Sequence, residues 1–105
     1  MKKDSALVLG GGAFGTSIAN LISENFKSVY VLVRSKDVYE SLKNGENSIY
    51  LPGKKLSKKI RPVMSWSDLE SKRDEIDLVV SGLPTAAICS FFTENREQIE
   101  FFLKK

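Results

Sequence analysis

Residues 6–15 read ALVLGGGAFG and carry the strongest indication of the fold. The apolar run at 6–9 is continuous, which is typical of a strand buried on both faces, as strands of parallel sheets are. The residues that follow fit the pattern G-x-G-x-x-G through Gly10, Gly12 and Gly15. A strand that runs directly into such a turn and then into a helix is the arrangement that binds the pyrophosphate of a dinucleotide.

A helix over residues 14–25 and a strand over 29–33 are predicted next along the chain. The helix is indicated by apolar side chains at helical spacing, which form one stripe that is expected to be buried. The stripe consists of Phe14, Ile18, Leu21 and Ile22. The strand is indicated by its β-branched and aromatic residues. Because crossover connections are right-handed, the strands at 6–9 and 29–33 are expected to form a parallel pair.

A short helix and a loop are predicted after the second strand. Ser35 is a suitable N-cap for the helix, and Asn44 followed by Gly45 is a suitable stop signal. Residues 47–59 are interpreted as a loop, because they contain a Pro-Gly pair and four lysines.

Further elements are predicted in the second half of the chain. Residues 60–63 are expected to be an edge strand, because Pro62 lacks the N–H that a central strand needs. Residues 67–70 match a capping box, so a short helix is expected to follow. The apolar run at 77–83 is the third clear strand, and a helical region with a break at 94–95 follows it.

Together these elements predict an α/β fold of the Rossmann type, with helices flanking a mostly parallel four-stranded sheet. The predicted strand order is 3-2-1-4, that is 60–63, 29–33, 6–9 and 77–83, and a cofactor would cross the carboxyl ends of the last two strands, where the order reverses. The sheet is expected to be incomplete on its C-terminal side, with an open edge at the last strand. Residues 1–105 are therefore interpreted as the N-terminal part of a dinucleotide-binding domain, without a C-terminal substrate domain.

Composition limits the chain to one small domain and excludes several chemistries. The chain has 105 residues and no histidine, which excludes Ser-His-Asp triads and His-ligated zinc, and no metal site is predicted. Its single cysteine, Cys89, is expected to be a buried structural thiol, and one cysteine favours a reducing cytoplasm. The net charge of +3 permits an anionic partner without requiring a nucleic acid. No apolar stretch approaches the roughly 18 residues of a membrane span.

Each glycine of the motif has a predicted role. Gly10 permits the tight turn, Gly12 lets a pyrophosphate approach the backbone, and Gly15 lets the helix pack close to the strand. The helix N-terminus adds N–H groups and the positive end of the helix dipole.

Basic residues follow the second strand and fill the later loop. Arg34 stands where NAD sites usually carry an acidic residue, and its guanidinium suits a 2′-phosphate or stacks on adenine, so NADP is favoured over NAD. A solvated loop charge is the alternative for Arg34. The loop cluster is interpreted as solvated rather than as a nucleic-acid site, because only Tyr50 offers a nearby ring for stacking. The cluster consists of Lys54, Lys55, Lys58, Lys59 and Arg61.

Three blocks of the sequence resemble the bacterial-type NAD(P)-dependent glycerol-3-phosphate dehydrogenases. The first is LVLGGGAFGT at 7–16. The second, NSIYLPG at 47–53, matches that family's N-x-x-Y-L-P-G segment and is far more specific than the glycines. The third is DLVV at 77–80 with LPT at 83–85, similar to the family's D-L-V-V…V-P-[ST] strand and turn. The spacing of the blocks agrees, and the resemblance covers essentially the whole chain.

The resemblance implies reduction of dihydroxyacetone phosphate to sn-glycerol 3-phosphate with NADH or NADPH. It implies a cytoplasmic enzyme of glycerophospholipid synthesis, and a homodimer is the assembly considered for the full-length parent. It places cofactor contacts on the glycine turn and beside the adenosine half. The expected cofactor-binding residues are Gly10, Gly12, Ala13, Phe14, Gly15, Arg34, Tyr50 and Pro84.

The chain departs from the family pattern at the turn and in its extent. Ala13 stands where a serine is common, and Phe14 replaces the usual Trp or Tyr. The family's first functional lysine lies in an S-x-x-K-G-like segment on the strand after 77–83, and a second lies in the C-terminal helical domain. Neither falls within these 105 residues, so no catalytic residue is assigned and the chain alone is expected to be inactive.

Two other functions remain open from the sequence. Another Rossmann dehydrogenase, such as a ketopantoate reductase or a hydroxyacyl-CoA dehydrogenase, shares the glycine motif but is disfavoured by the block at 47–53. A non-catalytic nucleotide-binding module is favoured by the short length and disfavoured by the close match to an enzyme family.

Overall fold

Four parallel strands form the central sheet of the protein, whose computed structural model describes residues 3–83 and 85–103. The strands are β1 (Lys3–Leu9), β2 (Phe26–Leu32), β5 (Ile60–Val63) and β6 (Ile76–Ser81). They lie in the order β5-β2-β1-β6, and each neighbouring pair is parallel. The predicted strand order is confirmed, and Pro62 lies on an edge strand as expected. Within the described residues, β6 forms the other edge of the sheet.

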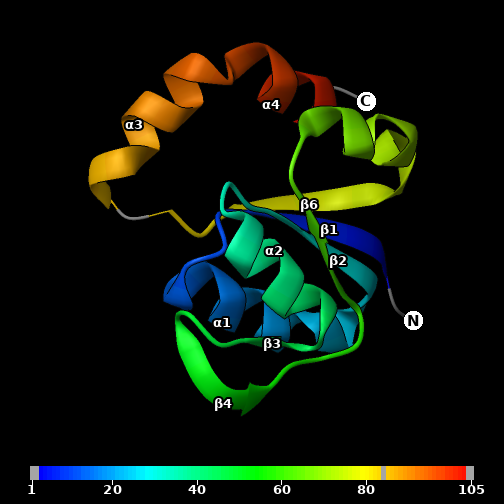
Figure 1. Cartoon of the computed structure of the whole chain (residues 1–105). Helices are drawn as coiled ribbons and strands as arrows, with labels where there is room; N and C mark the ends of the chain where they lie inside the picture. Colours follow the sequence, from blue (N-terminus) through cyan, green and yellow to red (C-terminus); the bar gives the residue numbers. More distant parts are fainter. Residues whose placement is uncertain (1–2, 84, 104–105) are drawn as a thin grey trace.

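Helices cover both faces of this sheet (Figure 1). On one face lie α1 (Ala13–Ile22), which continues as the 3₁₀ turn η1 (Ser23–Asn25), and α2 (Lys36–Lys43). On the other lie α3 (Thr85–Glu94), α4 (Arg96–Leu103) and the 3₁₀ helix η2 (Trp66–Glu75). Helices α3 and α4 part at Asn95, which confirms the predicted break at 94–95.

Side chains of β1 alternate between two hydrophobic clusters, one on each face of the sheet. Ala6 and Val8 pack with residues of α1 and α2, whereas Leu7 and Leu9 pack with residues of η2 and α4. All four side chains are fully buried. Full burial of a Val or Leu side chain contributes about 1.5–3 kcal/mol. The predicted two-sided burial of 6–9 is confirmed, and it fixes the strand from which the glycine turn leaves.

The buried side of α1 differs from the predicted apolar stripe. Its buried residues are Gly15, Thr16 and Ala19. Phe14 and Leu21, two members of the stripe, are 64% and 71% exposed, and the other two are only partly buried. Because small side chains let the helix backbone approach the strands closely, the contact face is made of the smallest residues. The stripe prediction is therefore wrong for this helix.

Residues 47–59, predicted to be a loop, contain most of a second, two-stranded sheet. Strand β3 (Glu46–Asn47) pairs antiparallel with β4 (Leu51–Lys55). Strand β4 is almost wholly exposed, so it lacks the alternation of apolar and polar residues by which strands are recognised. Its Pro-Gly pair also argues against a strand, and the loop prediction was wrong for this segment.

The predicted helix caps have opposite outcomes. Ser35 caps α2 as predicted, because its Oγ accepts a hydrogen bond from the Val38 N–H at 3.3 Å. Helix η2, however, has Ser65 as its N-cap, and Ser65 makes no side-chain cap hydrogen bond. The hydroxyl of Ser67 lies 2.9 Å from that of Ser65 and pairs with it. The capping box at 67–70 is therefore not the start of this helix.

The predicted burial of Cys89 is wrong. Cys89 is exposed on α3. Ile88 and Phe91, on the same helix, are partly buried, whereas Cys89 is exposed.

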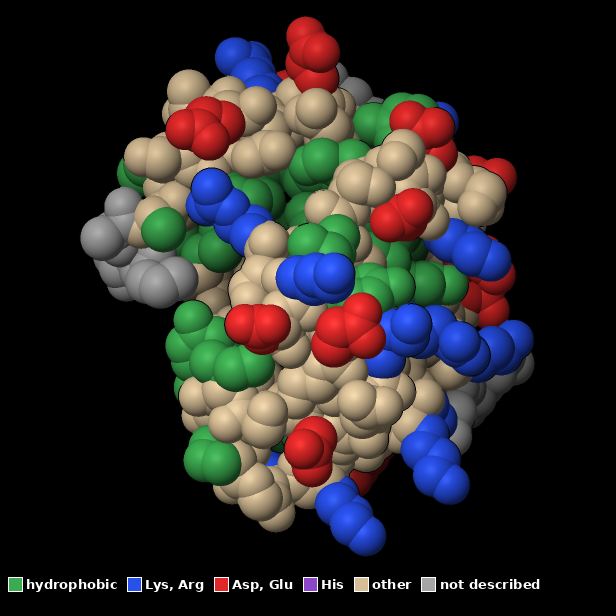
Figure 2. Space-filling view, viewed as in Figure 1, with side chains coloured by type: hydrophobic (Ala, Val, Ile, Leu, Met, Phe, Trp, Pro, Cys, Tyr) green, Lys and Arg blue, Asp and Glu red, His purple; other side chains and the backbone are tan. Residues whose placement is uncertain are grey.

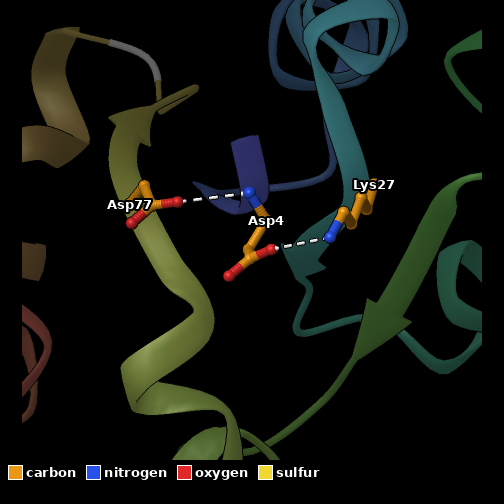
Figure 3. A network of polar contacts seen from close by, with 3 residues as sticks. All are labelled: Asp4, Lys27 and Asp77. Carbon is orange, nitrogen blue, oxygen red and sulfur yellow. Dashed lines mark hydrogen bonds and ion pairs between the residues drawn. The ribbon is translucent and has the colours of Figure 1, made fainter. Parts of the chain in front are cut away.

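The amino ends of three strands meet in a small polar network (Figure 3). The backbone N–H of Asp4 donates to Asp77 Oδ2 at 3.2 Å, and Lys27 Nζ lies 3.2 Å from Asp4 Oδ1. The ion pair is solvent-exposed, so it contributes only about 0–1 kcal/mol. This network lies at the opposite end of β1 from the glycine turn. The position of the glycine turn therefore depends on the hydrogen bonds between the strands and on the hydrophobic core, and not on this network.

Candidate functional site

A cavity of about 960 Å³ opens at the carboxyl ends of the parallel strands. Its walls come from the glycine turn, from the segments that follow β2, β5 and β6, and from α3. In Figure 2, hydrophobic side chains are exposed between the α3–α4 layer and the part of the molecule below it. Ligands of open α/β sheets bind outside the carboxyl ends of the strands, where the strand order reverses. Here that reversal falls at β1, so the cavity lies where a cofactor was predicted.

Most of the predicted cofactor-binding residues line this cavity. They are Gly10, Gly12, Ala13, Phe14, Arg34 and Tyr50. Gly15 is not in the wall but supports the turn from behind. Pro84 lies outside the described residues. The fold thus brings Arg34 and Tyr50, which are distant in the sequence, to the same cavity as the glycine turn.

The glycines hold the turn in a shape that leaves its outer side open. Gly10 has a φ of +104°, a left-handed conformation that favours glycine, and its N–H donates to the Leu32 carbonyl at 2.9 Å. A Cβ atom at Gly15 would collide with the carbonyl oxygen of Gly10. At Gly12, no atom of residues 3–83 and 85–103 lies within 4 Å of the place where a Cβ would stand. The backbone of Gly12 is therefore accessible to a group in the cavity.

The N-terminus of α1 adds an electropositive element to this open side. Gly12 is the N-cap and, as a glycine, has no side chain that could cap the helix, and the first turn carries no acidic residue. The N–H groups of a first helical turn have no acceptor within the helix, and the helix dipole places partial positive charge there. This end of the helix is therefore suited to bind an anion.

Two further glycines are needed for the turn, although the motif does not mark them. A Cβ atom at Gly11 would collide with the side chain of Val33, and one at Gly82 would collide with the Cα atom of Gly15. Gly11 falls at an unspecified position of G-x-G-x-x-G, and Gly82 follows a different strand. The signal that could have found Gly82 is a glycine directly behind an apolar strand.

A buried polar cluster lies behind the turn, where Asn47 and Thr16 are both fully buried. Asn47 Nδ2 donates to the Gly11 carbonyl at 2.9 Å and to Thr16 Oγ1 at 2.8 Å. Asn47 Oδ1 accepts from the Tyr50 N–H at 3.2 Å, and the Thr16 hydroxyl donates to the Gly11 carbonyl at 3.3 Å. In the sequence, Asn47 stands out only as part of the N-x-x-Y-L-P-G segment, because its partners on the turn are far away in the chain.

The segment after β2 gives the cavity a basic wall. Arg34 and Ser35 line the cavity, and the exposed Lys36 follows at the first position of α2. The only acidic residue in the first turn of α2 is Asp37. The end of β2 therefore presents a guanidinium to the cavity and no carboxylate.

Another part of the cavity wall is mainly apolar and aromatic. Met64, Trp66, Leu83 and Phe91 contribute to it. The ring centroids of Trp66 and Phe91 are 6.4 Å apart, and Trp66 Nε1 donates to Asn95 Oδ1 at 3.0 Å. Such a wall can contact the face of a planar ligand ring. These residues come from separate elements, so nothing in the sequence indicated that they line one cavity.

Among residues 3–83 and 85–103, no group of three or more acidic or cysteine side chains is placed to hold a metal ion. None of the helices in that part of the chain has the length and apolar character that crossing a bilayer requires.

A doubly wound sheet with a glycine turn of this kind places the protein in the class of Rossmann-type dinucleotide-binding domains. Comparison with known families narrows this class. The model for the NAD-dependent glycerol-3-phosphate dehydrogenase N-terminus matches residues 5–102. The chain belongs to this family.

Curated relatives agree with the family match. A glycerol-3-phosphate dehydrogenase (NAD(P)+) of Pseudomonas syringae pv. tomato is 37% identical over 93 residues, which cover 88% of this chain and 26% of the relative. Its counterpart in Pseudomonas fluorescens Pf-5 is 37% identical over 91 residues, covering 86% and 26%. The chain therefore spans about a quarter of the length of these relatives.

Solved structures confirm the fold. The glycerol-3-phosphate dehydrogenase of Coxiella burnetii superposes with a TM-score of 0.73 at 18% identity, covering 91% of this chain and 29% of that one. DsGPDH of Dunaliella salina gives a TM-score of 0.69 at 21% identity, covering 91% and 22%.

Proposed function

We propose that the cavity binds NADP(H) or NAD(H), and that the chain is the cofactor-binding part of a glycerol-3-phosphate dehydrogenase. The observation that carries this proposal is the open space at Gly12, which lies at the N-terminus of α1 inside a cavity of about 960 Å³. That volume is within the roughly 300–1,000 Å³ of ligand sites in proteins. The family match and the doubly wound α/β topology support the same assignment.

The residues of the turn have distinct parts in this proposal. The pyrophosphate lies over Gly12 and Ala13, where the N–H groups of α1 bind it. Gly10 and Gly15 act through the backbone shape, and Phe14, which is exposed at the cavity, covers one side of the cofactor. Tyr50, which directly precedes β4, borders the adenosine half. Pro84 belongs to the proposed set because it directly follows Leu83, a residue of the cavity wall.

The basic wall favours NADP over NAD in this proposal. Arg34 is exposed and lines the cavity, and the exposed Lys36, two residues further along the chain, adds a second positive charge nearby. A 2′-phosphate pairs well with a guanidinium, whereas a ribose 2′-hydroxyl is usually bound by a carboxylate at this place. Stacking of Arg34 on adenine is the alternative, and it would not distinguish the two cofactors.

The proposed reaction is the reduction of dihydroxyacetone phosphate to sn-glycerol 3-phosphate. Bound NAD(P)H supplies the hydride for such a reaction. The residues of this chain hold and orient the cofactor, whereas the lysines that the resemblance implies for catalysis fall outside its 105 residues. We therefore expect the chain alone to bind the cofactor without turnover. Cytoplasmic location, a role in glycerophospholipid synthesis, a homodimeric parent and the lack of a nucleic-acid partner belong to the same proposal.

A fluorescence titration of the chain with NADPH and NADH tests the proposal. The matched control is Gly12→Val, because the Gly12 backbone is extended, a Cβ there has no atom of the described residues within 4 Å, and the added side chain would occupy the proposed phosphate space. We expect saturable binding to the wild type that is lost in the variant, with the thermal unfolding temperature little changed. No binding to the wild type, or equal binding to both proteins, would contradict the proposal.

A further inference from the structure

The side-chain amide of Asn47 forms hydrogen bonds to two separate parts of the cavity wall, the glycine turn and the segment that carries Tyr50. Both donors of Nδ2 are engaged, with the Gly11 carbonyl and with Thr16 Oγ1, and Oδ1 accepts from the Tyr50 N–H. A carbonyl can only accept and a backbone N–H can only donate, so these partners fix which end of the amide is which. Asn47 is fully buried, so water does not compete for these bonds.

The contact with Gly11 determines the direction of a peptide group in the turn. The Gly11 carbonyl accepts from both Asn47 and Thr16, which point it away from the cavity into the protein. The Gly11 carbonyl and the Gly12 N–H belong to one planar trans peptide unit, so they point in opposite directions. Holding this carbonyl in the protein interior therefore turns the Gly12 N–H the other way, toward the cavity that Gly12 lines.

The contact with Tyr50 links the turn to a second wall. Asn47 lies on β3, and Tyr50 directly precedes β4, its antiparallel partner. Tyr50 lines the cavity and is half exposed. One buried side chain thus holds both the peptide at Gly12 and the backbone that carries the Tyr50 ring.

We propose that Asn47 is a positioning residue, which aims the Gly12 N–H at the cofactor's phosphates and keeps Tyr50 in register with the glycine turn. This inference rests on the proposed dinucleotide binding. Loss of the donors frees the Gly11 carbonyl to turn, because Thr16 alone then holds it. A carbonyl turned toward the cavity would face a phosphate with like partial charge.

Asn47→Asp is the variant that tests the proposal. It keeps the size of the side chain and the acceptor for Tyr50, but it removes both donors. The matched control is Ser41→Ala, because Ser41 Oγ accepts from the Ser48 N–H at 2.8 Å and holds the same hairpin without touching the glycine turn. Both proteins are titrated with NADH, and ¹H–¹⁵N spectra are recorded during titration with ADP, which carries the pyrophosphate.

We expect Asn47→Asp to bind NADH at least about tenfold more weakly than the wild type, and Ser41→Ala to stay within about twofold. The Gly12 amide signal is expected to shift on addition of ADP in the wild type and in Ser41→Ala, and to lose this shift in Asn47→Asp. A further variant, Asn47→Ala, also removes the acceptor of the Tyr50 N–H. We expect Asn47→Ala to weaken binding less in a Tyr50→Ala background than in the wild type, because the two residues act together on the same wall.

Unchanged binding by Asn47→Asp would overturn the inference, as would equal weakening by Ser41→Ala at a matched unfolding temperature. A persisting Gly12 shift in Asn47→Asp would also overturn it. Failure of the wild type to bind NADH is a different result, since it would contradict the proposed function itself.

Discussion

Gly15 and Gly82 pack backbone against backbone, so closely that a Cβ atom added to Gly82 would collide with the Cα atom of Gly15. This contact joins the first turn of α1 to the segment that follows β6. The glycine turn is therefore held from both sides, by its own strand β1 and by the neighbouring strand. The cavity wall at Gly82 and the open side of the turn consequently keep a fixed relation to each other.

The first prediction concerns this contact. Gly82→Ala should lower the free energy of unfolding by about 1–3 kcal/mol, because a methyl group is forced against backbone atoms. Urea unfolding followed by circular dichroism measures the change. Gly12→Ser is the control, since it adds atoms in open space at an N-cap position where serine is favoured. Equal unfolding midpoints for the two variants would show that the contact between the glycines relaxes easily.

The second prediction compares a buried leucine of β1 with an exposed leucine of α1. Leu7→Ala should cost about 2–5 kcal/mol, because Leu7 is fully buried in the cluster beneath η2 and α4. Leu21→Ala should change stability by no more than about 0.5 kcal/mol, because Leu21 is exposed on α1. Denaturant titration of the two variants compares them directly. A large loss in Leu21→Ala would mean that another surface covers α1.

The third prediction concerns cofactor preference. Arg34→Ala should raise the Kd for NADPH roughly tenfold or more, because a charge-assisted contact of about 1.5–3 kcal/mol is lost. The Kd for NADH should change by less than about threefold. Arg61→Ala, which removes an equal charge from edge strand β5 outside the cavity, should leave both values unchanged. Parallel losses for NADPH and NADH in Arg34→Ala would instead indicate stacking on adenine.

The fourth prediction distinguishes the two serines that the sequence offers as helix caps. Ser35→Ala should destabilise the protein by about 0.5–2 kcal/mol, because the Val38 N–H loses its acceptor. Ser67→Ala should be nearly neutral, since its hydroxyl pairs with that of Ser65 on the surface. Thermal unfolding of both variants provides the comparison. A larger effect at Ser67 would contradict the assignment of the caps.

The sequence predicts the sheet and the turn well, because their signals are local. The apolar run at 6–9 needs burial on both faces, and the glycine that follows needs a left-handed conformation. Strand order then follows from the right-handed crossover and from the position of Pro62 on an edge. These features depend on neighbours in the chain or on general rules of topology.

The predictions from the sequence that were wrong also have a physical reason. Helix α1 buries its small residues because its backbone must approach β1, so hydrophobicity is a poor guide to its buried face. Strand β4 is exposed and shows no alternation, so a pattern of burial could not reveal it. Asn47 depends on partners 31 and 36 residues away, and only the folded chain brings them together.

The central claim is that the glycine turn and the walls around it bind a dinucleotide. Its most direct test is a titration of the ¹⁵N-labelled chain with NADPH, in which the amide signals that move are assigned to residues. We predict that the moving signals belong to the turn at 10–14, to Arg34 and to Tyr50. Signals of the lysine-rich segment at 54–59 should stay in place. Shifts confined to that segment, or no shifts at saturating NADPH, would contradict the account.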